Sequence, residues 1–330
     1  MSVAACNVLL SSAGRRVALL RAFQDDLRAM QVAGTVSVAD ASPLTAAGHL
    51  AASLDRLPRV DAPTFADALI EVCDRRSIGL VVPTIDPELP VLAGIAERLR
   101  EAGVHPLISG SATTAIAGDK WRTHEHLAAA GIPTPPQWRP DEVRAAAKDL
   151  PFPLIAKPVA GSASIGIVVL ADVEAVRRHD ELDDSYLVQQ LVPGREHTVD
   201  VWVGRDGQVW DVVARERLEV RGGEVSKGVT RRDGAVLEAA RAVAASLPDA
   251  YGPLTIQVFR DDVGVQVIEV NARFGGGFPL AWEAGAHFPR WAIADALDLD
   301  PGPRAWHWQA DLLMLRFDDA VYLSASEVGW

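Results

Sequence analysis

Three polar side chains near residue 260 have the types and the spacing of a metal site. Side chains alternate across a strand, so Glu269 and Asn271 share one face of an otherwise apolar run. Gln257 lies on the preceding run and joins them if the two runs form a hairpin. One carboxylate and two amides supply hard oxygen ligands that suit Mg²⁺, which completes its shell with phosphate oxygens. A solvated polar face remains the alternative for these three residues alone.

The register of this hairpin depends on its turn. With a three-residue loop at 262–264, Asp261 pairs with Val265, and the first amide falls opposite the carboxylate. Gly264 would supply the left-handed residue that three-residue hairpin loops need.

Lys157 ends an apolar run, where a lysine points either to solvent or at an anion. A loop of small residues between two glycines follows, and its backbone N–H groups can close around phosphate. The residues singled out in this loop are Gly161, Ser162, Ser164 and Gly166. The loop is not a Walker A motif, because the lysine precedes it and no Gly-Lys-Ser/Thr follows. A surface lysine and a plain turn are the separate alternatives, but their adjacency favours a phosphate site.

Two sites at strand ends in the first hundred residues could hold a co-substrate. A turn after the first strand opens a helix, so its N–H groups and arginines attract an anion near Ser12, Gly14 and Arg15. Asp86 and Glu88 follow a later strand, where open α/β sheets bind ligands, and either could hold a substrate ammonium. A plain turn with solvated arginines, and a glutamate that only favours a helix N-terminus, are the alternatives.

Two further segments have residues that ligands approach closely. Segment 226–232 is cationic, and we expect a flexible loop whose Lys227 contacts the γ-phosphate or the acyl substrate, with a solvated loop as the alternative. Three glycines follow Arg273 directly and allow close backbone approach. We expect Gly276 and Gly277 to contact the acceptor substrate.

The elements that position these residues fall into two kinds. The first hundred residues alternate strand and helix, which predicts a parallel sheet with helices on both faces, ending near residue 112. The expected strands are 7–10, 35–39, 80–83 and 104–108, and the expected helices are 17–30, 65–76 and 88–102. A helix at 119–130 and a proline-rich connector follow. Beyond the connector the sequence is rich in strands, at 154–157, 165–170, 186–191, 197–203, 208–215, 255–260 and 265–271, with helices at 236–247 and 291–297.

Composition limits the class of protein. The chain has 330 residues, of which 49% are hydrophobic and 23% charged, as expected of a folded protein of two or three lobes. A net charge of −12 argues against a nucleic-acid or anionic-membrane partner. The two cysteines, Cys6 and Cys73, make neither a disulfide framework nor a zinc site. The N-terminus does not read as a signal peptide and no apolar run is long enough to span a bilayer, so we expect a cytoplasmic protein.

In order and spacing, these residues resemble the ATP-grasp superfamily, and most closely its carbamoyl-phosphate-synthetase-like branch, over roughly residues 115–285. The preceding residues resemble that superfamily's pre-ATP-grasp domain. The resemblance implies an α/β Rossmann-like domain at 1–112 and an α+β ATP-grasp domain at 113–330. Within the second domain it implies a small lid lobe at 121–191 and a large lobe at 192–330, which clasp ATP.

The resemblance also implies a role for each motif. Residues 186–196 resemble the family's hinge, in which backbone groups near 190–192 would meet the adenine edge and Glu196 the ribose. The implied nucleotide contacts are, in chain order, Lys120, Lys157, Gly161, Ser162, Ser164, Gly166, Gln190, Leu191, Val192 and Glu196. Gln257, Glu269 and Asn271 resemble the magnesium ligands, with two Mg²⁺ ions expected and Mn²⁺ as a substitute. Arg273 resembles the arginine that steadies the transferred phosphate and the acyl-phosphate. Lys227 of the cationic segment is the second candidate catalytic residue.

The sequence departs from the family pattern in two places. Many members carry a glutamate at the hinge where this chain has Gln189 and Gln190, so the contact to adenine N6 would fall to backbone groups. Gln257 stands where many members have a carboxylate. The metal would then be held with one charge less, and Glu269 is expected to bridge both ions.

The implied activity is ATP-dependent ligation of a carboxylate to an amine through an acyl-phosphate. The expected substrates are an amino acid or a small peptide-like acid and an amine, and a homodimer stays open. A small-acid kinase of the carbamate type and a non-catalytic nucleotide-binding protein are the rival interpretations. An NAD-dependent oxidoreductase is disfavoured, because Gly-x-Gly-x-x-Gly is absent after the first strand.

Overall fold

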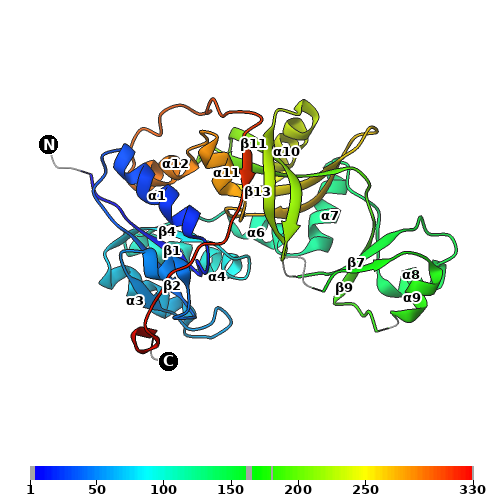
Figure 1. The fold of residues 1–330 in the computed structure, drawn as a ribbon, viewed down its shortest axis with the longest axis horizontal. Helices are drawn as coiled ribbons and strands as arrows, with labels where there is room; N and C mark the ends of the chain where they lie inside the picture. The colour runs from blue at the N-terminus through cyan, green and yellow to red at the C-terminus, as the bar shows by residue number, and fades with distance from the viewer. Residues whose placement is uncertain (1–3, 161–165, 180, 329–330) are drawn as a thin grey trace.

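The described part of the chain forms three β-sheets that lie in a row along the long axis of the molecule (Figure 1). The structure, a computed structural model, describes residues 4–160, 166–179 and 181–328. N-terminal residues form a five-stranded sheet at one end, a four-stranded sheet lies at the other end, and a six-stranded sheet lies between them.

The five-stranded sheet is parallel in the order β3-β2-β1-β4-β5, as the alternation of strands and helices predicted. Its strands are β1 Asn7–Ser11, β2 Val36–Asp40, β3 Leu54–Arg56, β4 Ile78–Pro83 and β5 His105–Pro106. Its helices are α1 Val17–Ala29, α2 Ala46–Leu50, α3 Phe65–Arg75, α4 Glu88–Gly94 and α5 Ala96–Glu101. The prediction of one helix over 88–102 was wrong, because Gly94 is a poor helix former and Ile95 leaves helical geometry.

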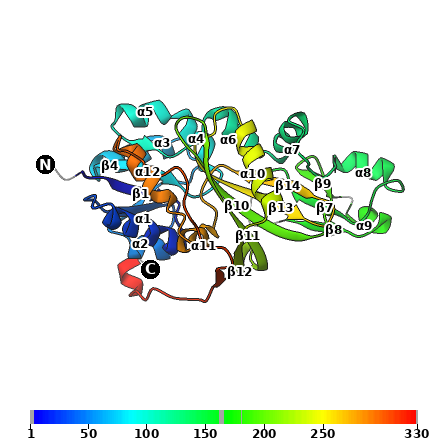
Figure 2. The ribbon, with the colours of Figure 1, turned by 90° about the horizontal axis from the view of Figure 1, so that it is seen from above.

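The four-stranded sheet is antiparallel in the order β6-β9-β7-β8. Its strands are β6 Gln137–Trp138, β7 Leu154–Pro158, β8 Val168–Leu170 and β9 Tyr186–Gln190. Helices α8 Pro140–Ala146 and α9 Val173–Arg178 lie on the side away from the six-stranded sheet (Figure 2). The apolar core beneath them includes Val143, Leu154, Ala156, Val176 and Val188. The opposite face of the sheet therefore looks toward the middle of the molecule.

The six-stranded sheet has the order β14-β13-β10-β11-β12-β15. Its strands are β10 Arg195–Val203, β11 Val209–Arg221, β12 Glu224–Arg231, β13 Gly252–Arg260, β14 Val265–Asn271 and β15 Leu313–Leu315. Helix α10 Gly234–Ser246 packs against its apolar face. The prediction of a flexible loop at 226–232 was wrong: most of that segment belongs to β12, which pairs with β11 and with the distant β15.

The remaining helices are α6 Ser111–Ala117, α7 Lys120–Ala129, α11 Phe278–Glu283, α12 Phe288–Ala296 and a 3-10 turn at Ala325–Val328. Helix α12 contacts α1 and β4, and α11 contacts α1. Leu9 and Val81 of the five-stranded sheet share one core with Val199 and Ile256 of the six-stranded sheet. Residues on both sides of the predicted domain boundary at 112 therefore pack together in one core. Within the described residues, every helix is too short or too polar to cross a membrane.

The turn of the β13–β14 hairpin differs from the prediction. Arg260, rather than Asp261, pairs with Val265. Gly264 does not have the positive φ that the predicted three-residue turn requires. Instead Asp261 Oδ1 accepts hydrogen bonds from the N–H groups of Val263 and Gly264, both at 2.9 Å, and this stabilises a four-residue turn.

A β-bulge further along the hairpin restores the predicted pairing of Gln257 with Glu269. Val258 pairs with Val267, but Gln257 pairs with Glu269, so Ile268 is an extra residue in β14. The predicted opposition of Gln257 and Glu269 is therefore present, although the turn that was expected to produce it is not.

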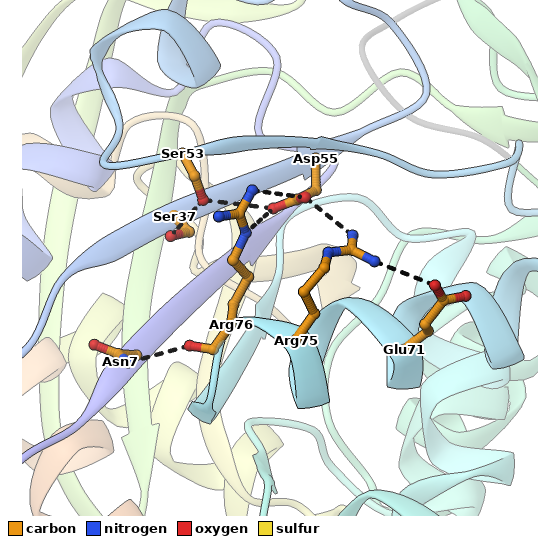
Figure 3. A network of polar contacts seen from close by, with 7 residues as sticks. All are labelled: Asn7, Ser37, Ser53, Asp55, Glu71, Arg75 and Arg76. Atoms are coloured by element: carbon orange, nitrogen blue, oxygen red, sulfur yellow. Dashed lines mark hydrogen bonds and ion pairs between the residues drawn. The ribbon is translucent and has the colours of Figure 1, made fainter.

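A buried carboxylate ties the end of β3 to the end of α3 (Figure 3). Asp55 accepts hydrogen bonds from Arg76 Nε at 2.8 Å and from Arg75 Nη2 at 3.0 Å. Arg75 also reaches Glu71, at 3.2 Å. Burial alone would raise the pKa of Asp55, but hydrogen bonds and charges from the two arginines outweigh it and hold that pKa below its usual value. The charged form of Asp55 therefore stabilises the fold.

We expect Asp55→Asn to lower the free energy of unfolding by about 1–3 kcal/mol at pH 7, because two guanidinium groups lose a charged partner. Asp61→Asn is the matched control: its ion pair with Arg59 is exposed, so the change should stay below about 1 kcal/mol. Folding lowers the pKa of Asp55, so its contribution is complete above roughly pH 4 and is lost as the pH falls through the folded value. Urea unfolding at pH 7 and pH 3 measures this. A difference between wild type and variant that does not shrink at pH 3 contradicts the assignment.

Candidate functional site

Lys157 and Gln189 lie at the centre of the inner face of the four-stranded sheet. Lys157 Nζ donates a hydrogen bond to Gln189 Oε1 at 2.6 Å, and both side chains are buried. Burial lowers the pKa of Lys157 to about 8, and Lys120 adds to the decrease. Glu269 and Glu196, from the six-stranded sheet, oppose it. The fold therefore brings four of the predicted site residues close enough for their charges to interact.

Arg217 holds Glu196 in place on the six-stranded sheet. Its Nη1 donates to Glu196 Oε1, and its Nη2 donates to the carbonyl of Gly223 at 3.1 Å. Burial raises the pKa of Glu196, and Arg217 opposes that increase. Arg217 was not among the predicted site residues, although its alternation with Arg215 along β11 indicates a polar face.

The three candidate metal ligands lie on one face of the β13–β14 hairpin. Gln257 pairs with Glu269, and Asn271 follows two residues later. Among the described residues, no group of three or more His, Cys, Asp or Glu side chains could hold a metal ion. A site here must combine one carboxylate with amide oxygens and with oxygens from a phosphate. That donor set fits Mg²⁺, which binds through one or two carboxylates plus substrate phosphates.

Arg273 connects this hairpin to the N-terminal sheet. Its Nη2 donates to Asp86 Oδ2 at 2.5 Å and to Asn271 Oδ1 at 3.3 Å, and its Nη1 donates to the carbonyl of Phe274 at 3.1 Å. Its Nε is buried and lacks a hydrogen-bond partner among the described residues. Asp86 was predicted to hold a substrate ammonium. In this structure it instead engages another predicted site residue, Arg273.

The start of α7 positions Lys120. Asp119 caps the helix, because its Oδ1 accepts hydrogen bonds from the N–H groups of Trp121 at 2.8 Å and Arg122 at 3.1 Å. The N–H of Lys120 donates to the carbonyl of Val159 at 3.3 Å. This bond places Lys120 beside the end of β7, where Lys157 lies.

The predicted phosphate loop is described only in part. Gly161, Ser162 and Ser164 lie outside the described residues. Gly166 has a φ of +74°, and a Cβ at this position would lie 3.0 Å from Pro158 Cγ. The backbone here therefore requires glycine.

Two backbone N–H groups of the predicted hinge already donate hydrogen bonds within the protein. The N–H of Gln190 donates to the carbonyl of Pro136, and that of Leu191 donates to the carbonyl of Pro153, both at 3.1 Å. The N–H groups of Gln190 and Leu191 therefore already have acceptors. The backbone groups left for a base edge would be the N–H of Val192 and the carbonyls of the three predicted residues.

Glu88 lies fully buried beneath the turn after β1. Its carboxylate accepts hydrogen bonds from Ser11 Oγ and Ser12 Oγ, both at 2.6 Å. Burial raises the pKa of Glu88 to about 7. Thr84 Oγ1 donates to the carbonyls of Ser11 and Ser12 at 3.0 and 2.7 Å. Glu88 thus holds the turn in place, which does not support the predicted direct contact with an ammonium.

A basic groove lies between α1 and the glycines that follow Arg273. The residues that matter for its charge are Arg15, Arg16, Glu224 and Arg316, beside Gly276. Glu224 Oε2 lies 3.3 Å from Arg15 Nη2 and 2.9 Å from Arg316 Nη1. Burial would raise the pKa of Glu224, but the arginines hold it below its usual value. Three arginines against one glutamate leave the groove positive, which suits a carboxylate.

Arg15 and Gly276 were predicted, whereas Glu224 and Arg316 were missed, since no local signal links residues so far apart. Two other predicted residues, Gly14 and Gly277, make contacts within the fold itself. The N–H of Gly14 donates to Asp40 Oδ2 at 3.1 Å. A Cβ on Gly277 would clash with a guanidinium nitrogen of the buried Arg215.

Lys227 forms an ion pair with a glutamate of the neighbouring strand β11. Its Nζ lies 2.7 Å from Glu219 Oε2, opposite it in the β11–β12 register. Lys227, with a smaller effect from Ser226, lowers the pKa of Glu219 to about 2. The predicted contact of Lys227 with phosphate would require this ion pair to open.

Two protein families match adjacent parts of the chain. Residues 117–277 match the ATP-grasp domain, and residues 8–107 match the PylC-like N-terminal domain. The two matches meet near the boundary between the five-stranded sheet and the rest of the chain.

Curated relatives align over part of their length. Phosphoribosylamine–glycine ligase of Streptomyces coelicolor is 34% identical over 161 residues, which is 48% of this chain and 37% of that protein. D-alanine–D-alanine ligase of Cereibacter sphaeroides is 37% identical over 124 residues, 36% of this chain and 39% of that protein. The chain thus matches less than half the length of either relative.

Solved structures share the fold over most of the chain. N5-carboxyaminoimidazole synthetase from Staphylococcus aureus, complexed with ADP, has a TM-score of 0.73 at 17% identity, covering 93% of this chain and 81% of that one. L-amino acid ligase from Bacillus licheniformis has a TM-score of 0.66 at 19% identity, covering 88% and 74%. A parallel α/β domain followed by antiparallel lobes is common to them. The two family matches show that the chain carries a PylC-like N-terminal domain followed by an ATP-grasp domain.

Proposed function

We propose that the protein is an ATP-dependent carboxylate–amine ligase that releases ADP and phosphate. One observation carries the proposal: Lys157 of the four-stranded sheet and Lys120 at the start of α7 lie near Glu196 and Glu269 of the six-stranded sheet, close enough for the other three charges to affect the pKa of Lys157. Such a group combines cations for phosphates with a carboxylate for the metal. The curated relatives named above are ligases by name, which supports this activity over a kinase or a binding protein.

The bound MgATP would supply the phosphoryl group and would offset the charge that develops on it. Lys120 and Lys157 would bind the phosphates, and Glu196 the ribose. Gln257, Glu269 and Asn271 would hold the magnesium, for which we propose two Mg²⁺ ions with Mn²⁺ as a substitute. Arg273 would neutralise charge on the transferred phosphate and then on the acyl-phosphate. Closure of the lobes would keep water away from that intermediate.

The basic groove supports an amino acid or a small peptide-like acid as substrate. Arg15, Arg16 and Arg316 could bind a carboxylate, and Glu224 among them could accept an ammonium. Arg16 donates to the carbonyl of Phe274 at 3.3 Å, next to Arg273, so the groove adjoins the proposed reacting centre.

The experiment is a screen of amino-acid pairs for release of ADP and phosphate, followed by the mass of the product. A ligase gives ADP and a condensed product. A small-acid kinase gives ADP and an acyl-phosphate or its hydrolysis product, and a binding protein gives no ADP with any pair. Either of the last two results overturns the proposal.

Glu269→Gln removes the only carboxylate of the metal set. We expect turnover to fall on the order of 10²-fold or more, while thermal melting stays near that of the wild type. Glu238→Gln, on the exposed side of α10, is the matched control. Near-normal turnover in Glu269→Gln would remove this residue from the metal site.

ATP affinity should depend on the protonation of Lys157. Its pKa is lowered to about 8, so the free protein loses this charge above pH 8, and the dissociation constant for ATP should rise up to about tenfold per pH unit. Lys157→Arg stays charged and should flatten the profile. Calorimetry with a non-hydrolysable ATP analogue between pH 7 and 9.5 measures both. A flat wild-type profile would show that Lys157 does not contact the phosphates.

Arg273→Lys keeps a positive charge beside Asp86 but loses the guanidinium fork. We expect kcat to fall on the order of 10²-fold with little change in ATP affinity, as for a contact made mainly in the transition state. Arg195→Lys, whose exposed side chain lies 3.5 Å from Glu216 Oε1, is the control. Loss of ATP binding with an unchanged kcat would instead make Arg273 a ground-state nucleotide ligand.

A further inference from the structure

A side chain of the protein itself closes the basic groove. Glu224 Oε2 lies 3.3 Å from Arg15 Nη2 and 2.9 Å from Arg316 Nη1, so this carboxylate joins the turn before α1 to the C-terminal segment. Its Oε1 lies against Gly276, where an added Cβ would be 3.0 Å away. The space that remains is about 30 Å³, roughly what one water molecule occupies in the liquid. A ligand larger than water can therefore enter only if Glu224 leaves its arginine partners.

A C-terminal strand places Arg316 in the groove. Strand β15 forms the edge of the six-stranded sheet beside β12, and the chain then runs back toward the N-terminal sheet (Figure 1). After β15 the N–H of Arg316 donates to the carbonyl of Ser226 at 2.9 Å. Its guanidinium donates to Glu224 and to the carbonyl of Gly276. Neither family match reaches Arg316, because they end at residues 107 and 277. Its place in the groove therefore follows from these contacts alone.

The backbone next to Glu224 is fixed, but its side chain is not. Arg217 Nη2 donates to the carbonyl of Gly223 at 3.1 Å, and Glu224 is the first residue of β12. The side chain of Glu224 is 28% exposed, so it can turn toward solvent without a change in the strand. The arginines therefore hold Glu224 in the groove by charge, and a ligand of suitable charge can take its place.

The charges of the groove decide which ligand can do this. Burial alone would raise the pKa of Glu224, but Arg15, Arg316 and Arg16 outweigh it, so Glu224 is charged at pH 7. A carboxylate that displaced Glu224 without bringing a cation would leave two negative groups side by side. An amine without a carboxylate would draw Glu224 away and leave the arginines without an anion. A ligand that carries both charges gives each group a partner.

We propose that Glu224 is an internal carboxylate that occupies the substrate's carboxylate site in the free protein and turns to bind the ammonium when an amino acid replaces it. The proposal deepens the function proposed above and rests on it. Glu224 and Arg316 are then the residues that make the groove specific for zwitterions. Acids that lack an amine, and amines that lack an acid, are disfavoured because neither can open the groove and leave every charge paired.

Modification of arginines by phenylglyoxal in the full chain, followed by peptide mass, measures occupancy of the groove without ATP. The probes are L-alanine, propionate, which lacks the amine, and ethylamine, which lacks the carboxylate. In the wild type, L-alanine should slow the modification of Arg15 and Arg316 at a concentration about tenfold lower than propionate. Ethylamine should not slow it. Arg21, on the exposed side of α1, is the internal reference.

Glu224→Gln removes the internal carboxylate. Without any probe, Arg316 should react several-fold faster in this variant, because its ion pair is gone. Propionate should protect about tenfold better than in the wild type, whereas L-alanine, which exchanges one ion pair for another, should change little. Arg316→Gln should weaken the protection of Arg15 by L-alanine about tenfold. Glu283→Gln, on the exposed side of α11, is the matched control and should leave all rates unchanged.

Three results overturn the inference. Equal protection by L-alanine and propionate in the wild type shows that the groove binds any carboxylate. Unchanged protection by propionate in Glu224→Gln shows that Glu224 does not occupy the carboxylate site. A wild type that none of the probes protects shows that the groove is not an amino-acid site, and ADP release in the screen of amino-acid pairs would then still support the ligase. If L-alanine protects but no pair releases ADP, the proposed function fails and the binding site stands.

Discussion

The guanidinium of Arg273 is the contact on which the alignment of the site depends. It belongs to the segment after β14, yet it donates to Asp86 at the end of the N-terminal sheet and to Asn271 in the candidate metal set. Thr255 fixes the backbone of Arg273 by donating to its carbonyl at 2.9 Å. An arginine buried to this degree is costly without a charged partner, so Asp86 is held where the two halves of the molecule meet. The candidate metal ligands and the basic groove are thereby placed next to each other.

The neutral partner of Lys157 has an electrostatic consequence. Gln189 accepts a hydrogen bond from the ammonium without cancelling its charge, whereas a glutamate there would form an ion pair. Burial is thus free to lower the pKa of Lys157 to about 8, and its charge remains available to an anion. Glu196, by contrast, has Arg217 as a dedicated counter-ion. The charge of Lys157 therefore stays available for the proposed phosphate contact, while Arg217 fixes the position of Glu196.

The spacing of apolar residues, every second residue in strands and every three or four residues in helices, was enough to predict most of these elements. This spacing reflects which face of a single element is buried. Where a second segment decides the structure, the prediction failed. Segment 226–232 carries Lys227 near its start and two arginines at its end, with Gly228 between them, and it becomes a strand because β11 and the distant β15 pair with it. The predicted turn of the β13–β14 hairpin was wrong by one residue. Residue propensities do not indicate the hydrogen bonds that the Asp261 side chain accepts in the turn or the bulge at Ile268.

The order and spacing of Lys120, Lys157, Glu196, Gln257, Glu269 and Asn271 were sufficient, by themselves, to indicate the family and the class of chemistry, because such residue types recur in fixed order along this fold. Only the tertiary structure showed that Asp86 engages Arg273 and that Glu88 is buried behind two serines. Only it placed Arg316 and Glu224 in the groove with Arg15. These contacts join segments far apart in the chain, and their partners are set by packing between sheets, which leaves no periodic trace in the sequence.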